Sequence, residues 1–276
     1  MEQWLKEGRQ GKMAYMENYF DKRTDPRLLV EGAKSVISVI HNYFPEAQYA
    51  QPKDAPKISK YAWGADYHHV LKAKLQELLE LMRTEYGEIN ARFFTDSAPV
   101  MDKVWAKRSG LGWIGKHTNL IVPKAGSFFF IGEIICDLEI EEDAPIKDFC
   151  GTCTRCLDAC PTEALSPYQI DAQKCISYLT IELKDNLPAE YRENMEGWAY
   201  GCDICQEVCP WNRHAKAHTG EEFKPLDFLL TLGAEDWKNL DAPTFKKMTK
   251  KSAMSRVKWE KMEDNLNSIG IKKLEM

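Results

Sequence analysis

The sequence Cys-Gly-Thr-Cys-Thr-Arg-Cys-Leu-Asp-Ala-Cys-Pro occupies residues 150–161 and decides how the rest of the chain is interpreted. Its spacing, C-x2-C-x2-C-x3-C-P, is the bacterial iron–sulfur run. A second run, C-x2-C-x3-C-P, follows at residues 202–210, and Cys175 lies between the two runs. Eight of the nine cysteines therefore lie within residues 150–209. Eight thiolates are what two [4Fe-4S] clusters need.

The spacing also predicts how these cysteines divide between two clusters. In two-cluster ferredoxins the fourth cysteine of such a run binds the other cluster. The same crossing gives a first set, consisting of Cys150, Cys153, Cys156 and Cys209. The second set consists of Cys160, Cys202 and Cys205, with Cys175 available to complete it. Zinc is the alternative, because C-x2-C pairs also form zinc sites, but the three-cysteine run and the Cys-Pro endings favour clusters.

Composition places the chain among ordinary globular proteins. Of its 276 residues, 44% are hydrophobic and 29% are charged, as is usual for a chain with a full core. No apolar run of about 18 residues is present, so no membrane span is expected, and residues 1–20 lack the apolar segment of a signal peptide. Clustered cysteines without an export signal favour metal-bound thiolates in the cytoplasm over disulfides. Cys136 ends an apolar segment and is expected to be a buried core thiol.

The net charge of −5 argues against a surface built throughout for nucleic acid, but the charges are unevenly distributed. Residues 246–261 contain one acid, Glu260, and the following basic residues: Lys246, Lys247, Lys250, Lys251, Arg256, Lys258 and Lys261. Such a stretch can bind a phosphate backbone even on an acidic protein. A solvated helix face is the simpler interpretation, and both remain open.

The hydrophobic pattern predicts an α+β fold in three parts: a mixed α/β domain at 1–140, a bacterial two-cluster ferredoxin-like domain at 141–219 and a short helical tail at 220–276. Residues 1–34 are expected to be helical, with a break near Asp25-Pro26-Arg27. Strands are expected at 35–44, 89–94, 120–122 and 127–136. Helices are expected at 69–86, 100–109, 171–183 and 252–269.

Several short motifs together resemble the epoxyqueuosine reductase family. Besides the cysteine runs, they are Asp-Pro-Arg-Leu-Leu at 25–29, Tyr-Ala-Trp-Gly-Ala-Asp-Tyr-His at 61–68, Asp-Ser-Ala-Pro-Val at 96–100, Gly-Leu-Gly-Trp-Ile-Gly-Lys at 110–116, Gly-Ser-Phe-Phe-Phe-Ile-Gly-Glu at 126–133 and Cys-Ile-Ser-Tyr-Leu-Thr-Ile-Glu at 175–182. The resemblance covers about residues 8–269. It implies a reductase that converts epoxyqueuosine to queuosine in tRNA, and a cobalamin-binding first domain. Two [4Fe-4S] clusters, fed by an external low-potential donor, would pass electrons to the cobalamin.

The resemblance also implies site residues. Asp96 is expected to be the proton donor to the epoxide oxygen. A carboxyl at a strand end beside Phe93 and Phe94 could be desolvated, which would suit a general acid near neutral pH. The alternative is that Asp96 caps the following helix, and the two roles are compatible. The motifs assign corrin contacts to Ser59, Tyr61, Lys103, Asn119 and Ser127.

The chain departs from the family pattern in several places. Asp102-Lys103 stands where Glu-Arg is common, and Asp264-Asn265 where Arg-Asn is common. The chain is expected to be a short form that starts late and lacks the C-terminal helical repeats that help longer members grip tRNA. A cobalamin reductase of a small molecule, similar to dehalogenases, and a ferredoxin-like electron carrier are therefore kept as alternative functions. A monomer is expected.

Overall fold

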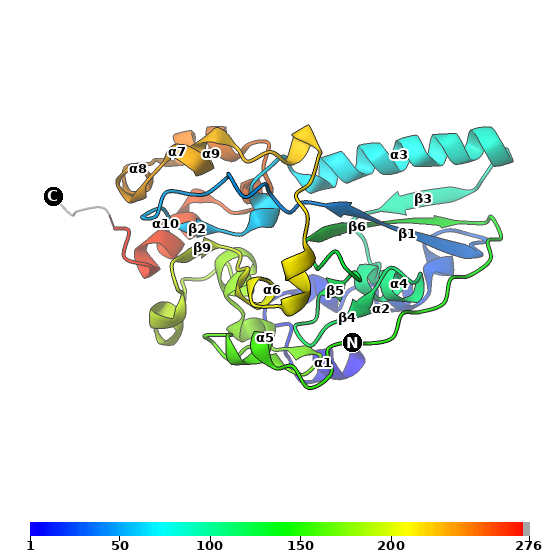
Figure 1. Ribbon diagram of the computed structural model, residues 1–276, viewed down its shortest axis with the longest axis horizontal. Helices are drawn as coiled ribbons and strands as arrows, with labels where there is room; N and C mark the ends of the chain where they lie inside the picture. The colour runs from blue at the N-terminus through cyan, green and yellow to red at the C-terminus, as the bar shows by residue number, and fades with distance from the viewer. Residues whose placement is uncertain (273–276) are drawn as a thin grey trace.

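The computed structural model describes residues 1–272, and its centre is a three-stranded antiparallel sheet (Figure 1). The strand order is β1-β6-β3, with β1 at Ser35–Asn42, β6 at Phe129–Cys136 and β3 at Ala91–Phe94. Cys136 at the end of β6 pairs with Ser35 on one side and with Ala91 on the other. The central strand β6 is largely buried, which suits its run of apolar and β-branched residues.

Helices cover both faces of this sheet. The long helix α3 (Tyr67–Tyr86) runs along one face, and α4 (Asp102–Arg108) lies on the other. Leu71, Leu75 and Leu79 on α3 are buried and recur every four residues, so they form one face of the helix. A Cβ at Gly132 of β6 would lie 2.9 Å from Cδ1 of Leu75, so a side chain at Gly132 would push α3 away from the sheet.

The start of α3 is fixed by a side-chain cap. The Asp66 carboxylate accepts the backbone N–H of His68, which satisfies one of the free donors of the first turn. Tyr67 therefore opens the helix at the end of the sheet where β3 leads into Asp96.

The cysteine region consists of short elements. The helices α5 (Arg155–Asp158) and α6 (Ile204–Glu207) each lie within one cysteine run, and they contact each other. The small ladders are β4 (Trp113–Ile114) with β5 (Leu120–Ile121), β7 (Leu165–Ser166) with β8 (Gln169–Ile170), and β2 (Lys57–Ile58) parallel to β9 (Trp198–Tyr200). The last of these joins the first domain to the cysteine region.

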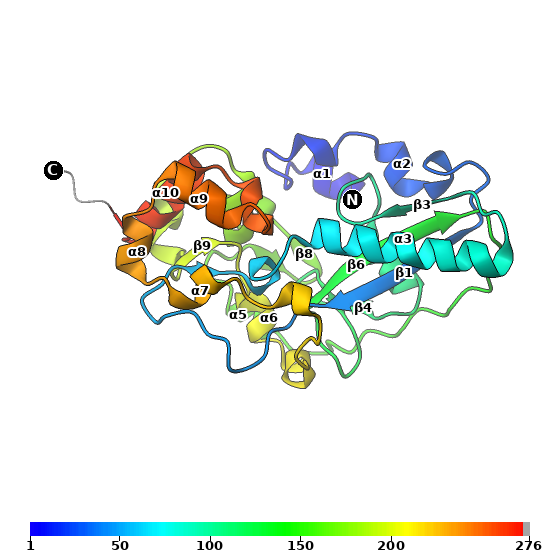
Figure 2. The ribbon, with the colours of Figure 1, turned by 90° about the horizontal axis from the view of Figure 1, so that it is seen from above.

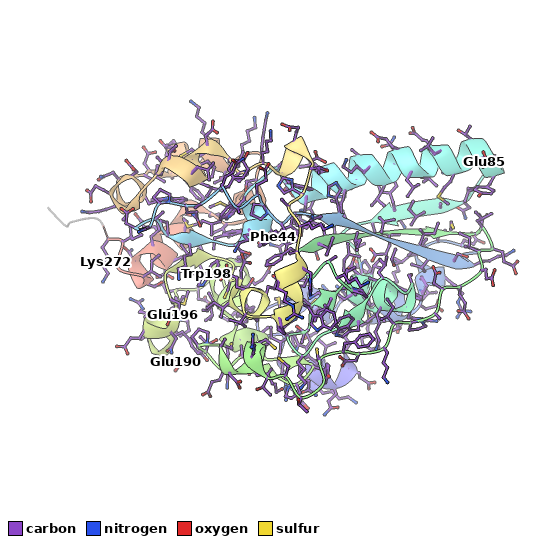
Figure 3. The ribbon with its side chains drawn as sticks, in the orientation of Figure 1. Phe44, Glu85, Glu190, Glu196, Trp198 and Lys272 are labelled. Atoms are coloured by element: carbon purple, nitrogen blue, oxygen red, sulfur yellow. The ribbon has the colours of Figure 1, made fainter. Side chains whose placement is uncertain are left out.

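The two ends of the chain pack against these parts. The N-terminal segment carries α1 (Glu2–Lys6) and α2 (Phe20–Thr24). The tail carries α7 (Asp227–Thr231), α8 (Ala234–Lys238), α9 (Ala242–Thr249) and α10 (Trp259–Ser268), gathered at one end of the molecule (Figure 2). Tail residues such as Trp237 and Met262 belong to the same hydrophobic core as Leu75 and Ile134. Glu85 near the end of α3 and Lys272 lie at opposite ends of the long axis (Figure 3).

The fold class expected from the sequence is confirmed, whereas the three-part division stays a prediction. The expected strands of the first domain and the helix at 100–109 are present with shorter bounds, whereas the helix expected at 69–86 begins two residues earlier, at Tyr67. None of the helices within residues 1–272 is long and apolar enough to cross a bilayer.

Three expected helices are wrong in extent. Residues 171–183 form a 3-10 turn (Ala172–Lys174), an extended Cys175 and a π-helical turn (Tyr178–Glu182). The Thr180 hydroxyl donates to the carbonyl of Ile176 and accepts the N–H of Gly201, so contacts with β9 override the local helical pattern. In 252–269, extended Val257 separates a 3-10 turn (Ala253–Arg256) from α10. Residues 1–34 hold only short helices, interrupted at Tyr19 (φ 56°) and Asp25.

Candidate active site and cluster sites

The first set of cysteines surrounds a small cavity. Cys150, Cys153, Cys156 and Cys209 line a space of about 80 Å³, together with Lys116, His117, Ile121, Phe149, Pro210 and Trp211. Aromatic rings shield it, since Trp113 packs edge-on against Phe149 and Trp211 with ring centroids 5.4 and 4.8 Å apart. Cys209 of the second run therefore lies with the three cysteines Cys150, Cys153 and Cys156 of the first run, which is the grouping expected from the spacing.

The second set also gathers in one place. The charges of Cys160 and Cys175 both raise the pKa of the Cys202 thiol. In the same way, the charges of Cys175 and Cys202 raise the pKa of the Cys205 thiol. The extended backbone of Cys175 (φ −70°, ψ 127°) follows the 3-10 turn that Asp171 caps. The charge of Cys156, which belongs to the first set, also raises the pKa of Cys205. The two sets are therefore neighbours, as electron exchange between two clusters requires.

The thiols fit clusters better than a single ion. Burial is the main cause that raises the pKa of Cys156 to about 11 and the pKa values of Cys175 and Cys205 above the ordinary range. Bound metal supplies the positive charge that deprotonates such thiols. Within residues 1–272 no three potential ligands converge closely enough to hold one metal ion.

Asp96 lies in the turn after β3 and is held by a tyrosine. Its backbone has a left-handed φ of 44°, an uncommon conformation that non-glycine residues adopt mainly at tight turns and functional sites. The Tyr67 hydroxyl donates a short hydrogen bond to Oδ2 of Asp96, and Nε2 of His68 lies 4.0 Å from the same oxygen. Burial is the largest cause that raises the pKa of Tyr67, and the charge of Asp96 is the second. Tyr67 therefore keeps its proton and remains a donor.

Two expectations for Asp96 are wrong. Its side chain is 65% exposed, so Phe93 and Phe94 do not desolvate it. These rings alternate along β3, and the turn after the strand carries Asp96 out of their reach. Asp96 is also not a helix cap, because α4 begins later, with Met101 at the N-cap position.

Lys103 connects Asp96 with the second set. Its ammonium donates to Oδ1 of Asn119 at 2.8 Å and to the carbonyl of Thr118 at 3.2 Å. Burial is the main cause that lowers the pKa of Lys103, while Asp96, Cys205 and Cys175 raise it. The Lys103 side chain is exposed and lines a cavity of about 580 Å³, together with Trp4, Met16, Val104 and Ile170 among others.

The other expected corrin contacts lie at different depths. Tyr61 packs against Tyr67 and Tyr200, with ring centroids 6.2 and 6.0 Å apart, and lies near Asp96. Ser59 is buried and donates to the buried carboxylate of Asp203. Ser127 accepts N–H groups from Gln206 and Asn212, each at 3.0 Å. Lys103 therefore lines the cavity and holds Asn119 through a hydrogen bond, while Ser59 and Ser127 tie the first domain to the second cysteine run.

Sequence reasoning missed the ion pair near Asp96. Nη2 of Arg256 lies 2.8 Å from Oε1 of Glu182, and Arg256 also interacts with Asp96. Tyr15 belongs to this group, and burial followed by Glu182 raises its pKa to about 12. The signal was present, because Arg256 lies in the basic stretch and Glu182 in the motif at 175–182. Lys261, the last residue of the basic stretch at 246–261, is not part of an exposed basic surface. It is buried and donates to the carbonyl of Asp185 at 3.0 Å.

A pair of carboxyl groups lies beneath the Asp96 turn. Glu133 on β6 is fully buried, and Asp102 at the start of α4 faces it. Burial, followed by the charge of Asp102, raises the pKa of Glu133 to about 11. Neither Glu133 oxygen has a hydrogen-bond partner within residues 1–272. Glu133 is therefore a neutral acid at pH 7, and the sequence alone gave no sign of it.

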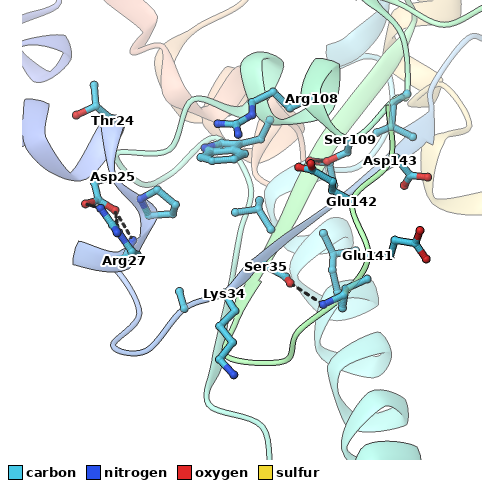
Figure 4. Close-up of a pocket in the computed structure, with 18 residues that line it drawn as sticks. Thr24, Asp25, Arg27, Lys34, Ser35, Arg108, Ser109, Glu141, Glu142 and Asp143 are labelled. Atoms are coloured by element: carbon cyan, nitrogen blue, oxygen red, sulfur yellow. Dashed lines mark hydrogen bonds and ion pairs between the residues drawn. The ribbon is translucent and has the colours of Figure 1, made fainter. Parts of the chain in front are cut away.

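A larger cavity lies apart from this site, beside β1 (Figure 4). It measures about 650 Å³ and is lined by residues 24–27, 33–38 and 140–143 together with residues of α4 and the following turn. Asp25 holds Arg27 at 2.8 Å, and Arg108 stacks on Trp105 at 4.7 Å. None of the site residues expected from the sequence lines this cavity, so no catalytic role is assigned to it.

Comparison with known proteins gives two family matches. The family model described as "4Fe-4S double cluster binding domain" matches residues 149–212. The model described as "Epoxyqueuosine reductase QueG, DUF1730" matches residues 23–97.

Individual proteins match over nearly the whole chain. The epoxyqueuosine reductase of Leadbetterella byssophila is 56% identical over 268 residues, covering 96% of this chain and 87% of the relative. The structure of epoxyqueuosine reductase from Streptococcus thermophilus has a TM-score of 0.83 at 31% identity, covering 98% of this chain and 74% of that one. A crystal structure of epoxyqueuosine reductase with a tRNA-Tyr epoxyqueuosine-modified stem loop has a TM-score of 0.77 at 32% identity, covering 91% and 67%.

A double-cluster domain whose second set of thiols acts, together with Asp96, on Lys103 defines an iron–sulfur oxidoreductase. The identity and coverage of the relatives narrow this class further. The chain belongs to the epoxyqueuosine reductase family. The resemblance seen in the sequence motifs is thereby confirmed, and so is the double [4Fe-4S] domain.

Proposed function

We propose that this chain reduces epoxyqueuosine in tRNA to queuosine. Removal of the epoxide oxygen leaves an alkene and releases the oxygen as water, so each turnover consumes two electrons and two protons. Two [4Fe-4S] clusters that each carry one electron match the electron demand. The electrons come from an external low-potential donor, and the enzyme acts as a cytoplasmic monomer.

The observation that carries this proposal is the shared surroundings of Lys103. Asp96, Cys175 and Cys205 all act on its ammonium, so the proposed proton donor and the second set of cysteines lie within electrostatic reach of one residue. An electron carrier would need the cysteines alone. A reductase needs electrons and protons delivered to one place, and the surroundings of Lys103 bring the groups for both together.

Residues that line the cavity beside Lys103, or that lie near Lys103, fit a corrin cofactor. Lys103 and Asn119 offer polar groups for its amide side chains, Tyr61 offers an aromatic edge, and Val104 and Ile170 provide apolar surface. Ser59 and Ser127 complete the proposed set, although both now bind the second cysteine run. When bound, cobalamin would supply a reduced cobalt able to reduce the epoxide carbon. The first set holds one cluster, and the second set holds the other.

Asp96 acts as the general acid. Its exposed carboxyl can reach a substrate, and the epoxide oxygen takes its proton as the C–O bond breaks. The Tyr67 hydroxyl then stabilises the carboxylate that remains, through the hydrogen bond to Oδ2. A hydrogen bond from Tyr67 is stronger to a carboxylate than to a neutral carboxyl group. Its stabilisation therefore grows as the proton leaves Asp96, as an interaction that lowers the reaction barrier should.

Exposed lysines of the tail lie next to this site and form the phosphate-binding surface. Lys246, Lys247, Lys250 and Lys251 are exposed on α9 and the turn after it. The carbonyl of Lys251 accepts the backbone N–H of Asp66, the residue that caps α3 in front of Tyr67. A tRNA backbone on these lysines would therefore pass close to the Tyr67–Asp96 pair.

Anaerobic reconstitution with iron, sulfide and cobalamin, followed by turnover of an epoxyqueuosine-containing anticodon stem loop, tests the proposal. About eight irons and one cobalt per chain are expected, together with formation of queuosine detected by mass spectrometry. Asp96→Asn should keep both metals and lose about 10²–10⁴-fold in rate. Eight irons without cobalt would overturn the cobalamin site, and a loaded protein that leaves the stem loop unchanged would overturn the substrate.

The same preparation decides between the alternatives. Reversal of charge at Lys246, Lys247, Lys250 and Lys251 should abolish stem-loop binding. If binding persists, the lysines are not the tRNA surface. If the wild type never binds, a small-molecule reductase is the better interpretation. An electron carrier would show cluster reduction without cobalt and no effect of Asp96→Asn.

A further inference from the structure

Two buried N–H groups near the first set lack any protein acceptor. Trp113 and His117 are 1% and 2% exposed, and neither Nε1 of Trp113 nor Nε2 of His117 has a hydrogen-bond partner within residues 1–272. Buried donors in folded proteins are almost always satisfied, so each such group calls for an explanation.

The backbone determines which nitrogen of His117 carries the proton. The N–H of Asn119 donates to Nδ1 of His117 at 3.1 Å. A neutral imidazole whose Nδ1 accepts must carry its proton on Nε2. His117 borders the cavity that the four cysteines line, and the orphaned Nε2–H is its only free donor. Packing therefore fixes the Nε2–H of His117 as a donor at the edge of the cavity, where an acceptor would have to lie.

Trp113 is held in a similar way. Its ring packs in one hydrophobic cluster with Cys150 and Cys209, so the unpartnered indole N–H lies beside the first set. The ladder between β4 and β5 pairs Trp113 with Ile121, and contacts with Phe149 and Trp211 fix the ring. The indole cannot rotate away to find water without disturbing this packing.

We propose that Nε1–H of Trp113 and Nε2–H of His117 donate hydrogen bonds to sulfur atoms of the cluster held by Cys150, Cys153, Cys156 and Cys209, and thereby raise its reduction potential. Reduction adds negative charge to the sulfurs, so a fixed N–H donor stabilises the reduced cluster more than the oxidised one. The inference rests on the proposed assignment of the first set to one cluster.

Lys116 adds to this environment. Its ammonium donates to the carbonyls of Gly151 and Cys153 at 2.7 and 2.9 Å. A positive charge is thus fixed on the loop that carries two ligands of the first set, where it also favours reduction. The segment 113–117 therefore places three donors beside the first set.

The variants Trp113→Phe and His117→Asn remove one donor each. Phenylalanine keeps an aromatic ring among Phe149 and Trp211. The short amide of asparagine can still accept the N–H two residues on, as in an Asx turn, but does not reach the cavity. Trp237→Phe is the matched control, because Trp237 is fully buried, has an unpartnered Nε1 and lies in the tail core.

The measurement is an anaerobic redox titration of the reconstituted full chain, followed by EPR, with iron content determined alongside. Each donor variant should lower the reduced-to-oxidised ratio of one cluster about tenfold at fixed potential, which is ~59 mV for a one-electron couple. The other cluster should not shift, and Trp237→Phe should shift neither. Cys150→Ala should abolish the signal that the donor variants move.

Several results would overturn the inference, and they differ from failure of the cluster assignment. Iron-loaded donor variants with unshifted potentials would show that the N–H groups do not reach the cluster. A shift of both clusters, or an equal shift in Trp237→Phe, would indicate a general structural effect. A wild type that takes up no iron would instead refute the cluster assignment itself. Should a variant fail to fold, pulsed EPR on wild type labelled with ¹⁵N only in tryptophan and histidine side chains still decides, since these nuclei must couple to the reduced cluster of the first set, and absence of that coupling would overturn the inference.

Discussion

Replacement of the buried acid Glu133 by glutamine should make the protein more stable, and increasingly so as the pH rises. Glu133 is fully buried on β6, and burial, followed by Asp102, raises its pKa from 4.5 to about 11. Between these two values the unfolded chain ionises at this position while the folded protein keeps the proton. Folding therefore takes up a proton, and the stability present below pH 4.5 is progressively lost as the pH rises toward 11.

The size of the effect follows from the pKa difference. Each pH unit above the unfolded value costs about 1.4 kcal/mol. At pH 7, about 2.5 units above that value, the cost is ~3 kcal/mol. Glutamine has nearly the same shape and stays neutral, so Glu133→Gln removes this cost. Its amide can also donate to the Asp102 carboxylate, which the neutral acid now faces.

Urea unfolding of wild type and Glu133→Gln, followed anaerobically by tryptophan fluorescence at pH 6, 7 and 8, checks the reasoning. The advantage of the variant should grow by about 1.4 kcal/mol per pH unit. Glu88→Gln, at an exposed position, should show no such trend. An advantage that stays constant from pH 6 to 8, or a variant less stable than the wild type at pH 8, would refute the idea that Glu133 is neutral in the folded state.

Three further predictions concern the proposed function. Tyr67→Phe removes the donor to Asp96 and should slow anaerobic stem-loop turnover by about 10–100-fold, the value of one hydrogen bond to a charged group, while a rate equal to wild type would deny Tyr67 this role. Lys250→Glu combined with Lys251→Glu should weaken stem-loop binding and flatten its dependence on salt, and an unchanged slope of log Kd against log salt would remove both lysines from the interface. Cys175→Ala should retain about four of eight irons after reconstitution, and a full complement would mean that another group completes the second set.

Local sequence was informative wherever the chemistry depends on close spacing. The runs at 150–161 and 202–210 place sulfurs on tight turns whatever surrounds them, so they predicted the double-cluster domain. Helix α3 and strand β6 were also readable, because burial of one helix face or of a whole strand leaves a periodic apolar pattern in the chain. The motif at 96–100 pointed to Asp96 through family resemblance, not through physical chemistry alone.

Other features depended on contacts between distant segments. The sequence pattern around Cys175 predicts a helix, but the Thr180 hydroxyl accepts the N–H of Gly201, which follows β9. The segment therefore forms two short turns in place of a continuous helix. Asp96 reads as a buried acid after two phenylalanines, but its turn exposes it. Lys261 reads as part of a basic surface, but it is buried against the Asp185 carbonyl.

The sequence by itself therefore determined the fold class, the double-cluster domain and the family, because these are encoded in short-range spacing and periodicity. Only the tertiary structure decided which other side chains meet: Arg256 with Glu182 near Asp96, and Glu133 with Asp102 beneath it. The physical reason is that burial and pairing are properties of packed surfaces. A residue's protonation, exposure and partners are set by segments far away in the chain, and no local pattern records them.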